Sequence, residues 1–393
     1  MDHCNPLSRL ARAAPMSIPP RLVCPNSDDA VAGIRAALRS GGYENVLVVH
    51  GGRSYRDSGA AGLLAQALSA VTHREVECAS GLPEVARVNE VLGRASKSDL
   101  VIGVGGGSVI DTAKLIACFS ARSLKSWFAA KPSAPRRTSA LWAIPTTSGT
   151  GAEMTPFATV FKGERKHSVE HPLLRPDLAL SIPELLRSQS SAVLRFSALD
   201  ALTQAIESYW STRATRASRA LARPAIEMTL NELTRIANGL PPNYSVLADA
   251  SGRAGEAIAI TRTTACHAVS YPLTGRFGIA HGQAVAITLA PMMRYVDDCG
   301  EDTVQPGASL TTLRRSASAI AACFRVRTLT MAAQRMEQLL DALRVERRLT
   351  LLGCDSPEHR QRVLDEGFSP ERVNYLPRVL SRSALERMLI GLG

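Results

Sequence analysis

The 393-residue sequence is poor in lysine and in aromatic residues. Only six of its 46 basic residues are lysine, all between Lys97 and Lys166, and aromatic residues make up 5% of the chain. The net charge of +11 comes from arginines spread along the sequence. Because nucleic-acid-binding proteins usually gather their positive charge in a stripe or tail with aromatics between, we expect no nucleic-acid partner. An anionic small molecule is a better match for this charge.

Long apolar runs are also missing. No stretch reaches the roughly 18 uninterrupted apolar residues of a transmembrane helix. Residues 1–20 lack the apolar centre of a secretory signal. We therefore expect a cytoplasmic protein with no membrane partner.

The eight cysteines include no pair with CxxC spacing, which argues against a zinc ribbon or a disulfide framework. Cys266 stands beside a histidine, but we interpret it as a small buried residue. The content of 45% apolar and 21% charged residues is typical of a globular protein.

Two different patterns divide the chain. In the first half, apolar runs such as NVLVVH (45–50) and LVIGVG (100–105) alternate with helical periods. This alternation predicts an α/β dinucleotide-binding domain with a parallel sheet over residues 1–185. Residues 186–393 carry helical periods without a convincing strand series, which predicts an all-helical domain. Because Asp200, His267 and His281 lie in it, we expect this domain to bind metal and substrate.

A glycine-rich loop, GVGGGSVID, follows the apolar run at 100–105 and precedes a helical pattern. Glycines allow backbone N–H groups to approach an anion, and a helix N-terminus adds favourable partial charge, so we expect a pyrophosphate here. The structural alternative is a plain tight turn in which Ser108 and Asp111 form a capping box. The residues predicted to bind the cofactor are Gly105, Gly106, Gly107, Ser108 and Asp111.

A second polar loop, PTTSGTGAE, follows the apolar run at 140–144. Thr146, Thr147 and Thr150 supply hydroxyl donors beside two glycines. Because the carboxyl ends of parallel strands meet at one edge of a sheet, both loops are expected at the same dinucleotide.

The loop after the run at 45–50 lacks an acid that would bind a ribose 2′-hydroxyl. Gly52, Arg53 and Ser54 stand there instead and are suited to a 2′-phosphate, so NADPH should at least be tolerated. The alternative is that Arg53 is a solvated loop residue.

Polar residues interrupt two apolar segments of the second half. Asp200 and Gln204 lie one turn apart on a predicted helix among Ala, Leu and Ile. A buried carboxylate costs roughly several kcal/mol unless a cation or a donor offsets it. His267 and His281 also lie in apolar surroundings, where a lone histidine is usually a satisfied core residue. Together the four offer a plausible ligand set for a divalent metal.

These motifs resemble a known family. GGGSVIDTAK, PTTSGTGAEMTPF, LDALTQAIESY and CHAVSYPL…AHG, in this order, are similar to the iron-containing (group III) alcohol dehydrogenases over about residues 40–295. The resemblance implies a dehydroquinate synthase-like fold, an NAD(P)H cofactor, Fe²⁺ or Zn²⁺ or another divalent metal, and a homodimer. It assigns the metal to Asp200, His267 and His281, with Gln204 where the family usually has a histidine.

A second departure and a closer similarity narrow the resemblance. Tyr271 stands where the family usually has another active-site histidine, and it is an expected proton donor. LDALTQAIESYWS, RTTACHAVSYPLT and KHSVEHPLLRPDLAL are similar to a branch of the family, the phosphonoacetaldehyde reductases of phosphonate natural-product and antibiotic biosynthesis. This implies reduction of phosphonoacetaldehyde to 2-hydroxyethylphosphonate.

Basic residues suit such a substrate. Lys166, His171, Arg175 and Arg262 supply donors for a phosphonate dianion, and Lys166 is also a candidate catalytic residue. Alternatively, Arg175 and Arg262 pair with carboxylates or face solvent.

Three alternative functions remain: a reductase of another small anionic aldehyde, a dehydroquinate-synthase-like lyase, and a nucleotide-binding protein with a lapsed metal site.

Overall fold

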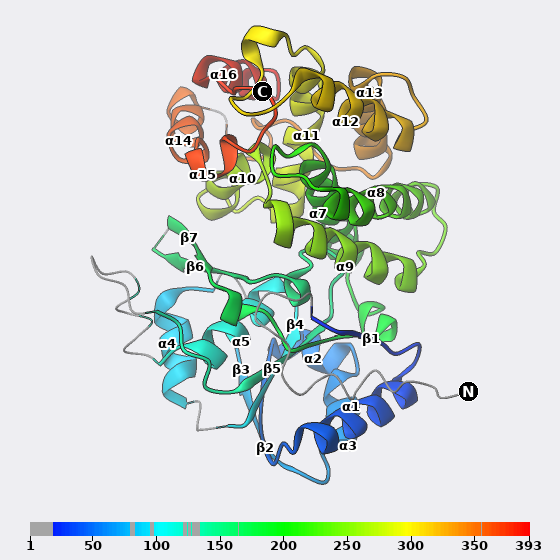
Figure 1. The fold of residues 1–393 in the computed structure, drawn as a ribbon, viewed down its shortest axis with the longest axis vertical. Coiled ribbons are helices and arrows are strands. Elements are labelled where there is room, and N and C mark those ends of the chain that lie inside the picture. The colour runs from blue at the N-terminus through cyan, green and yellow to red at the C-terminus, as the bar shows by residue number, and fades with distance from the viewer. Residues whose placement is uncertain are drawn as a thin grey trace. The chain divides into compact units, whose positions relative to one another are not determined.

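The computed structural model describes residues 19–78, 83–94, 98–120, 124, 127, 134–163, 165–354 and 356–393. It consists of two compact units, Met1–Ser190 and Ser191–Gly393 (Figure 1).

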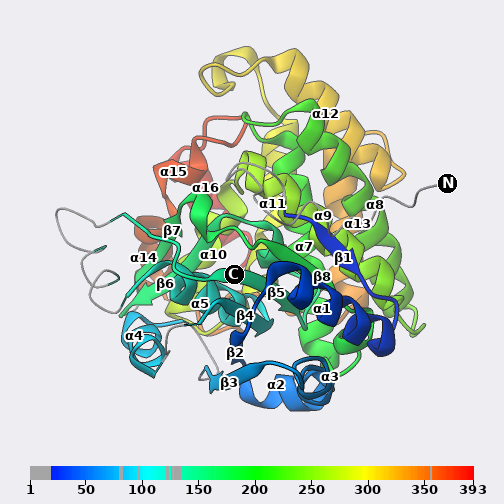
Figure 2. The same cartoon turned by 60° about the horizontal axis from the view of Figure 1, so that its bottom comes forward.

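The first unit is built on a six-stranded, all-parallel sheet (Figures 1 and 2). Its strand order is β1-β8-β5-β4-β2-β3. The central strand β4 is buried along its whole length, as expected for a parallel sheet that is covered on both faces. The strands are β1 (Arg21–Val23), β2 (Asn45–His50), β3 (Thr72–Glu77), β4 (Leu100–Gly105), β5 (Ala140–Pro145) and β8 (Leu178–Ser181).

Helices cover both faces of this sheet. Alternate residues of β2 belong to different cores: Val48 packs with α1 and α3, and Val49 packs with α4 and α5. This alternation is the two-residue period of a strand with an apolar layer on each side. The helices are α1 (Ser27–Gly41), α2 (Gly52–Asp57), α3 (Ala60–Ala67), α4 (Val85–Arg94) and α5 (Gly107–Cys118).

An antiparallel hairpin of β6 (Phe157–Lys162) and β7 (Arg165–Glu170) follows β5 and the short helix η2 (Ala152–Met154). The chain then returns to the sheet through η3 (Pro172–Leu174), and η4 (Pro183–Leu186) follows β8.

The second unit is helical, and its described residues form no β-strand. The helix α7 is buried on nearly all sides and packs against α8, α9 and α11 in one large apolar core. A helix that is apolar all round belongs at the centre of a bundle. The helices are α7 (Ser191–Trp210), α8 (Arg216–Ala237), α9 (Tyr244–Thr261), α10 (Ala265–Gly275), α11 (His281–Asp297), η5 (Glu301–Thr303), α12 (Leu310–Cys323), α13 (Leu329–Ala342), α14 (Pro357–Gly367), α15 (Pro370–Val373) and α16 (Arg382–Ile390).

The predicted fold class, a parallel α/β sheet followed by a helical region, is confirmed.

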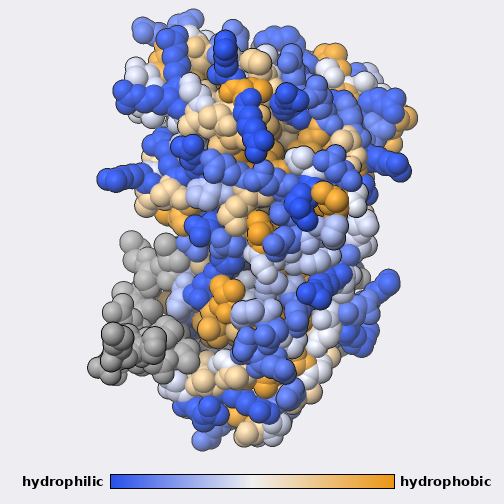
Figure 3. All heavy atoms as spheres, turned by 90° about the vertical axis from the view of Figure 1, so that its right-hand side faces the viewer, coloured by the Kyte–Doolittle hydropathy of each residue, from blue (hydrophilic) through white to orange (hydrophobic). Residues whose placement is uncertain are grey.

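Hydrophilic side chains cover much of the face in Figure 3, with apolar residues scattered among them. Within the described part of the chain, no helix combines the length and the apolar character needed to cross a bilayer. The seven cysteines that the structure describes are all free thiols.

Candidate active site

The helix α7 carries two polar side chains on one face. Asp200 and Gln204 are 2% and 4% exposed, and Gln204 Nε2 donates to Asp200 Oδ1 over 3.2 Å. Gln204 Oε1 is buried and has no hydrogen-bond partner among the described residues. Because a buried carbonyl oxygen without a partner is destabilising, this atom points to a donor or a cation at the site.

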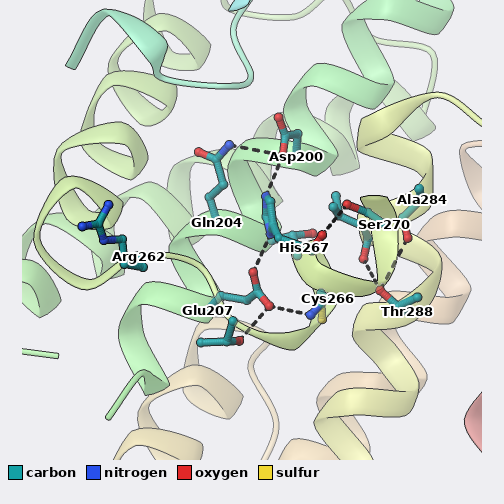
Figure 4. A network of polar contacts seen from close by, with 12 residues as sticks. Asp200, Gln204, Glu207, Arg262, Cys266, His267, Ser270, Ala284 and Thr288 are labelled. Atoms are coloured by element: carbon teal, nitrogen blue, oxygen red, sulfur yellow. Dashed lines mark hydrogen bonds and ion pairs between the residues drawn. The ribbon is translucent and has the colours of Figure 1, made fainter. Parts of the chain in front are cut away.

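Two histidines from other helices meet Asp200. His267 is the third residue of α10 and His281 is the first residue of α11. Their Nε2 atoms lie 3.2 Å and 3.8 Å from Asp200 Oδ1. One ligand atom from each of Asp200, His267 and His281 lies within 4.8 Å of the others. The structure therefore brings together three of the four residues predicted as metal ligands, with Gln204 beside Asp200. Figure 4 shows Asp200, Gln204 and His267 of this group.

The donor types fit a divalent cation. A carboxylate, two imidazoles and an amide oxygen are ligands that Fe²⁺ and Zn²⁺ accept, and the orphaned Gln204 Oε1 would gain a partner. The His281 side chain is 31% exposed, whereas those of Asp200 and His267 are 4% and 6% exposed. The group is thus approachable from the His281 side.

Glu207 is a buried residue of this site that the sequence did not single out. Its side chain is fully buried on α7 and accepts a bond of 2.5 Å from His267 Nδ1 (Figure 4). Burial opposes ionisation of Glu207, but the bonds from His267 and Thr264 outweigh it and lower its pKa. Glu207 lies seven residues after Asp200, two turns along the same helix, and this spacing is the sequence signal that could have indicated it.

The same carboxylates act on His267. Burial alone would lower the pKa of His267, but Glu207 and Asp200 raise it to about 9. A cation bound at Nε2 would replace that proton, as imidazole ligation requires. Burial raises the pKa of the neighbouring Cys266 thiol well above its ordinary value, which fits the interpretation of a small buried residue.

Tyr271 lies on α10 one turn after His267 and is partly exposed. Residues four apart on a helix share a face, so Tyr271 and His267 are neighbours on α10.

The two glycine loops of the first unit lie side by side. Gly105 and Pro145 are partners in the β4–β5 register, and Thr146 N donates to Gly105 O over 3.0 Å. A Cβ at Gly107 would lie 2.7 Å from Thr150 Cγ2, so only glycine allows this approach. A Cβ added at Gly106 would lie 3.5 Å from Thr147 Oγ1, so these two predicted cofactor residues are also neighbours.

The second loop contains two buried hydroxyls. The hydroxyls of Thr146 and Ser148 are buried and have no hydrogen-bond partner within the described ranges. Together with the N-terminus of α5, which begins at Gly107, they form a polar cradle that fits an anionic ligand.

Asp111 has a structural role. Its carboxylate accepts from Thr159 N over 2.8 Å and from the buried Lys114 Nζ over 3.4 Å, which joins α5 to β6. The capping box of Ser108 and Asp111 is wrong, because the N-cap is Gly106, which has no side chain, and Ser108 lies inside the helix.

The residues that were expected to tolerate a 2′-phosphate lie in the first turn of α2. Arg53 is highly exposed and pairs with Asp57 over 3.1 Å, and Ser54 Oγ donates to Gly51 O over 2.8 Å. Glu77, the last residue of β3, packs its carboxylate against Gly52, where an added Cβ would lie 2.1 Å from Glu77 Oε1. A carboxylate from the neighbouring strand therefore lies beside the first residue of α2.

The predicted phosphonate residues are divided between the units. Arg175 and His171 flank η3 in the first unit, and His171 Nδ1 accepts from Leu173 N over 3.2 Å. Lys166 belongs to β7, but its side chain lies outside the described residues. Arg262 is the C-cap residue after α9 in the second unit and has a φ of 69°, a strained conformation for a residue other than glycine.

Comparison with known proteins identifies the family. The family model described as iron-containing alcohol dehydrogenase matches residues 19–183, and the model of the C-terminal part of that family matches residues 196–389. A phosphonoacetaldehyde reductase of Streptomyces viridochromogenes is 35% identical over 75% of this chain and 76% of its own length. A long-chain-alcohol dehydrogenase of Geobacillus thermodenitrificans is 37% identical over 52% of this chain and 53% of its own length.

Solved structures share the fold. The sulfoacetaldehyde reductase of Bifidobacterium kashiwanohense, in complex with NAD⁺, superposes with a TM-score of 0.82 at 24% identity, covering 96% of this chain and 97% of its own. The iron-containing alcohol dehydrogenase of Thermococcus thioreducens gives a TM-score of 0.81 at 23% identity, covering 95% and 98% of the two chains. From the two family models, which span both units, and from the 35% identical relative, we conclude that the chain belongs to the iron-containing alcohol dehydrogenase family.

Proposed function

We propose that this chain is a metal-dependent NAD(P)H-linked reductase that converts phosphonoacetaldehyde to 2-hydroxyethylphosphonate. The observation that carries the reaction class is the meeting of Asp200, His267 and His281 from three helices. The substrate rests on the 35% identity with a phosphonoacetaldehyde reductase over three quarters of the chain. As expected from the resemblance, we also propose a homodimer in the cytoplasm and a role in phosphonate biosynthesis.

Four side chains would hold the metal: Asp200 through its carboxylate, His267 and His281 through imidazole nitrogen, and Gln204 through Oε1. A divalent cation there would supply Lewis-acid polarisation of a carbonyl, and a reduced nicotinamide would supply the hydride. Burial of Asp200 and His267 keeps water from these ligands, while the more exposed His281 leaves an approach for a substrate.

The dinucleotide would be bound by the paired glycine loops. Backbone N–H groups at Gly106 and Gly107 and the start of α5 suit the pyrophosphate. Thr146 and Ser148 would use their buried hydroxyls as further donors.

We further propose that NADH is preferred to NADPH, although NADPH was expected to be tolerated. In related sheets, an acid near the phosphate-binding strand accepts the ribose 2′-hydroxyl and repels a 2′-phosphate. Glu77 reaches the loop after β2, the strand next to β4, and can take this role. The pairing of Arg53 with Asp57 weakens its case as a phosphate ligand.

For the phosphonate end we keep the predicted basic residues as candidates: Lys166, His171 and Arg175 of the first unit, and Arg262 of the second. Charge-assisted hydrogen bonds from such residues favour a dianion over a neutral aldehyde. The sulfoacetaldehyde reductase that shares this fold acts on another small anionic aldehyde, which makes sulfoacetaldehyde a natural competitor in a substrate comparison.

Tyr271 Oη is our candidate for the group that hands a proton to the product oxygen, since Tyr271 shares the His267 face of α10. Lys166 is kept as a second candidate catalytic residue through its positive charge.

Steady-state kinetics would test this proposal. With Fe²⁺ added under anaerobic conditions and NADH oxidation followed at a wavelength of ~340 nm, we expect kcat/KM for phosphonoacetaldehyde to exceed that for acetaldehyde by about 100-fold. Two charge-assisted bonds would account for this ratio. Equal values for phosphonoacetaldehyde, sulfoacetaldehyde and acetaldehyde would contradict the substrate and leave the dehydrogenase class intact. No NADH oxidation with any aldehyde would contradict the reductase and favour the lyase alternative.

A further inference from the structure

A buried chain of polar groups runs behind His267. Trp210 Nε1 donates to Thr264 Oγ1 over 3.2 Å, and Thr264 Oγ1 donates to Glu207 Oε1 over 2.7 Å. Cys266 N also donates to Glu207 Oε1 over 2.7 Å, and His267 Nδ1 lies 2.5 Å from Glu207 Oε2. Glu207 and Thr264 are completely buried and Trp210 is 2% exposed, so water does not compete for these bonds.

Chemistry fixes the direction of each bond. An indole N–H and a backbone N–H can only donate, so Thr264 receives the Trp210 proton and its single hydroxyl proton goes to Glu207. Glu207 Oε1 accepts hydrogen bonds from the Thr264 hydroxyl and from Cys266 N, and Oε2 is left to accept one from His267 Nδ1. A carboxylate has no proton to give, so His267 must carry one on Nδ1.

We propose that Glu207 is a positioning residue that keeps the proton of His267 on Nδ1 and thereby presents Nε2 to a cation held with Asp200. A histidine ligand commonly donates its second ring N–H to a carboxylate, which fixes the tautomer and increases its affinity for the metal. The inference deepens the proposed function and rests on its metal site.

A simpler structural role must be separated from this one. Cys266 N belongs to the first turn of α10, where helical N–H groups lack partners, and Glu207 caps it from the neighbouring helix. If capping were its only task, any acceptor at the Oε1 position would serve.

Glu207→Gln separates the two roles. Because Thr264 and Cys266 both donate to the Oε1 position, the amide oxygen of glutamine belongs there and its NH₂ group faces His267 Nδ1. The hydrogen bond that caps Cys266 N is retained, but His267 Nδ1 must now accept a hydrogen bond from the glutamine NH₂ group. The neutral ring then carries its proton on Nε2, the atom that a cation needs.

The experiment measures Zn²⁺ affinity of the full chain by competition with a chromophoric chelator, together with imidazole ¹⁵N shifts. For the wild type loaded with Zn²⁺ we expect the His267 proton on Nδ1. For Glu207→Gln we expect Zn²⁺ affinity to fall about 10- to 100-fold and the proton of neutral His267 to move to Nε2. The melting temperature of the metal-stripped protein should change little.

The matched control is Glu232→Gln, because Glu232 is another buried acid that accepts a backbone N–H, from Asn243, and its ion pair is with Arg235. It should leave Zn²⁺ affinity unchanged. Thr264→Val removes one donor to Glu207 without reversing the His267 bond, so a smaller loss of affinity is expected. If Glu207→Gln does not fold, the Thr264→Val variant provides the test instead. An unchanged Zn²⁺ affinity in Thr264→Val would then contradict the role of Glu207.

Wild-type affinity in Glu207→Gln, or reduced affinity with the proton still on Nδ1, would overturn the role of Glu207. Failure of the wild type to bind Zn²⁺ or any divalent cation would instead overturn the metal site of the proposed function.

Discussion

The two units build their polar sites in different ways. In the first unit, the loops after β4 and β5 approach each other because Gly107 lacks a Cβ, and the hydroxyls of Thr146 and Ser148 have no partner in the described protein. In the second unit, side chains from α7 and α10 satisfy one another, and Glu207 alone receives three hydrogen bonds. Gln204 Oε1, in contrast, has no hydrogen-bond partner among the described residues.

This difference separates two kinds of preorganisation. A backbone cradle suits a phosphate, which takes many weak donors, whereas a metal needs a few ligands held at fixed positions by supporting groups. Substitutions in each unit should therefore affect one ligand and spare the other.

The largest effect is expected for Asp200→Ala. Removing the only carboxylate of the ligand group should abolish metal retention and lower kcat/KM by at least about 10³-fold, since the metal contributes several kcal/mol. NADH binding by the first unit should persist. Metal analysis and fluorescence titration would check both, with Asp341→Ala, an exposed acid of the same unit, as control. Loss of NADH binding as well would break the division between the units.

Gly107→Ala tests the opposite side of the comparison. The new Cβ would meet Thr150 at 2.7 Å and separate the two loops. We expect kcat/KM to fall about 10²-fold through weaker coenzyme binding, while metal content is unchanged. Gly62→Ala is the matched control, since nothing lies within 4 Å of its Cβ position. Equal effects of Gly107→Ala and Gly62→Ala on kcat/KM would contradict the role of the two loops in binding the coenzyme.

Gln204→Met removes the orphaned oxygen at similar volume. Metal affinity should fall about tenfold, because one neutral ligand is lost. The stability of the metal-stripped protein should not fall to match. Isothermal titration with Zn²⁺ and thermal melting would measure the two effects. Unchanged affinity would mean that Gln204 is not a ligand.

The smallest effect concerns coenzyme choice. Glu77→Gln replaces a charged acceptor by a neutral one, so the ratio of kcat/KM for NADH to that for NADPH should fall about fivefold. Arg53→Ala should leave this ratio unchanged, because Arg53 pairs with Asp57. A wild-type preference for NADPH would show that Glu77 does not select the coenzyme.

The sequence predicted the fold class because its period changes from strands alternating with helices to helices alone. It also singled out Asp200, Gln204, His267 and His281, since polar residues in apolar segments are conspicuous. It did not indicate Glu207, whose role depends on α10 lying beside α7, or Glu77, whose carboxylate reaches a loop after a different strand. The spacing of seven residues from Asp200 places Glu207 on the same face of α7, but its contact with His267 joins distant segments, is set by packing and is encoded by no local pattern.

Anomalous diffraction at a metal absorption edge, from crystals of the chain loaded with Fe²⁺ or Zn²⁺, tests the central claim most directly. We predict one strong peak within bonding distance of Asp200, His267 Nε2 and His281, with Gln204 Oε1 turned toward it. A peak elsewhere, or a fully loaded crystal with no density at this group, would contradict the account.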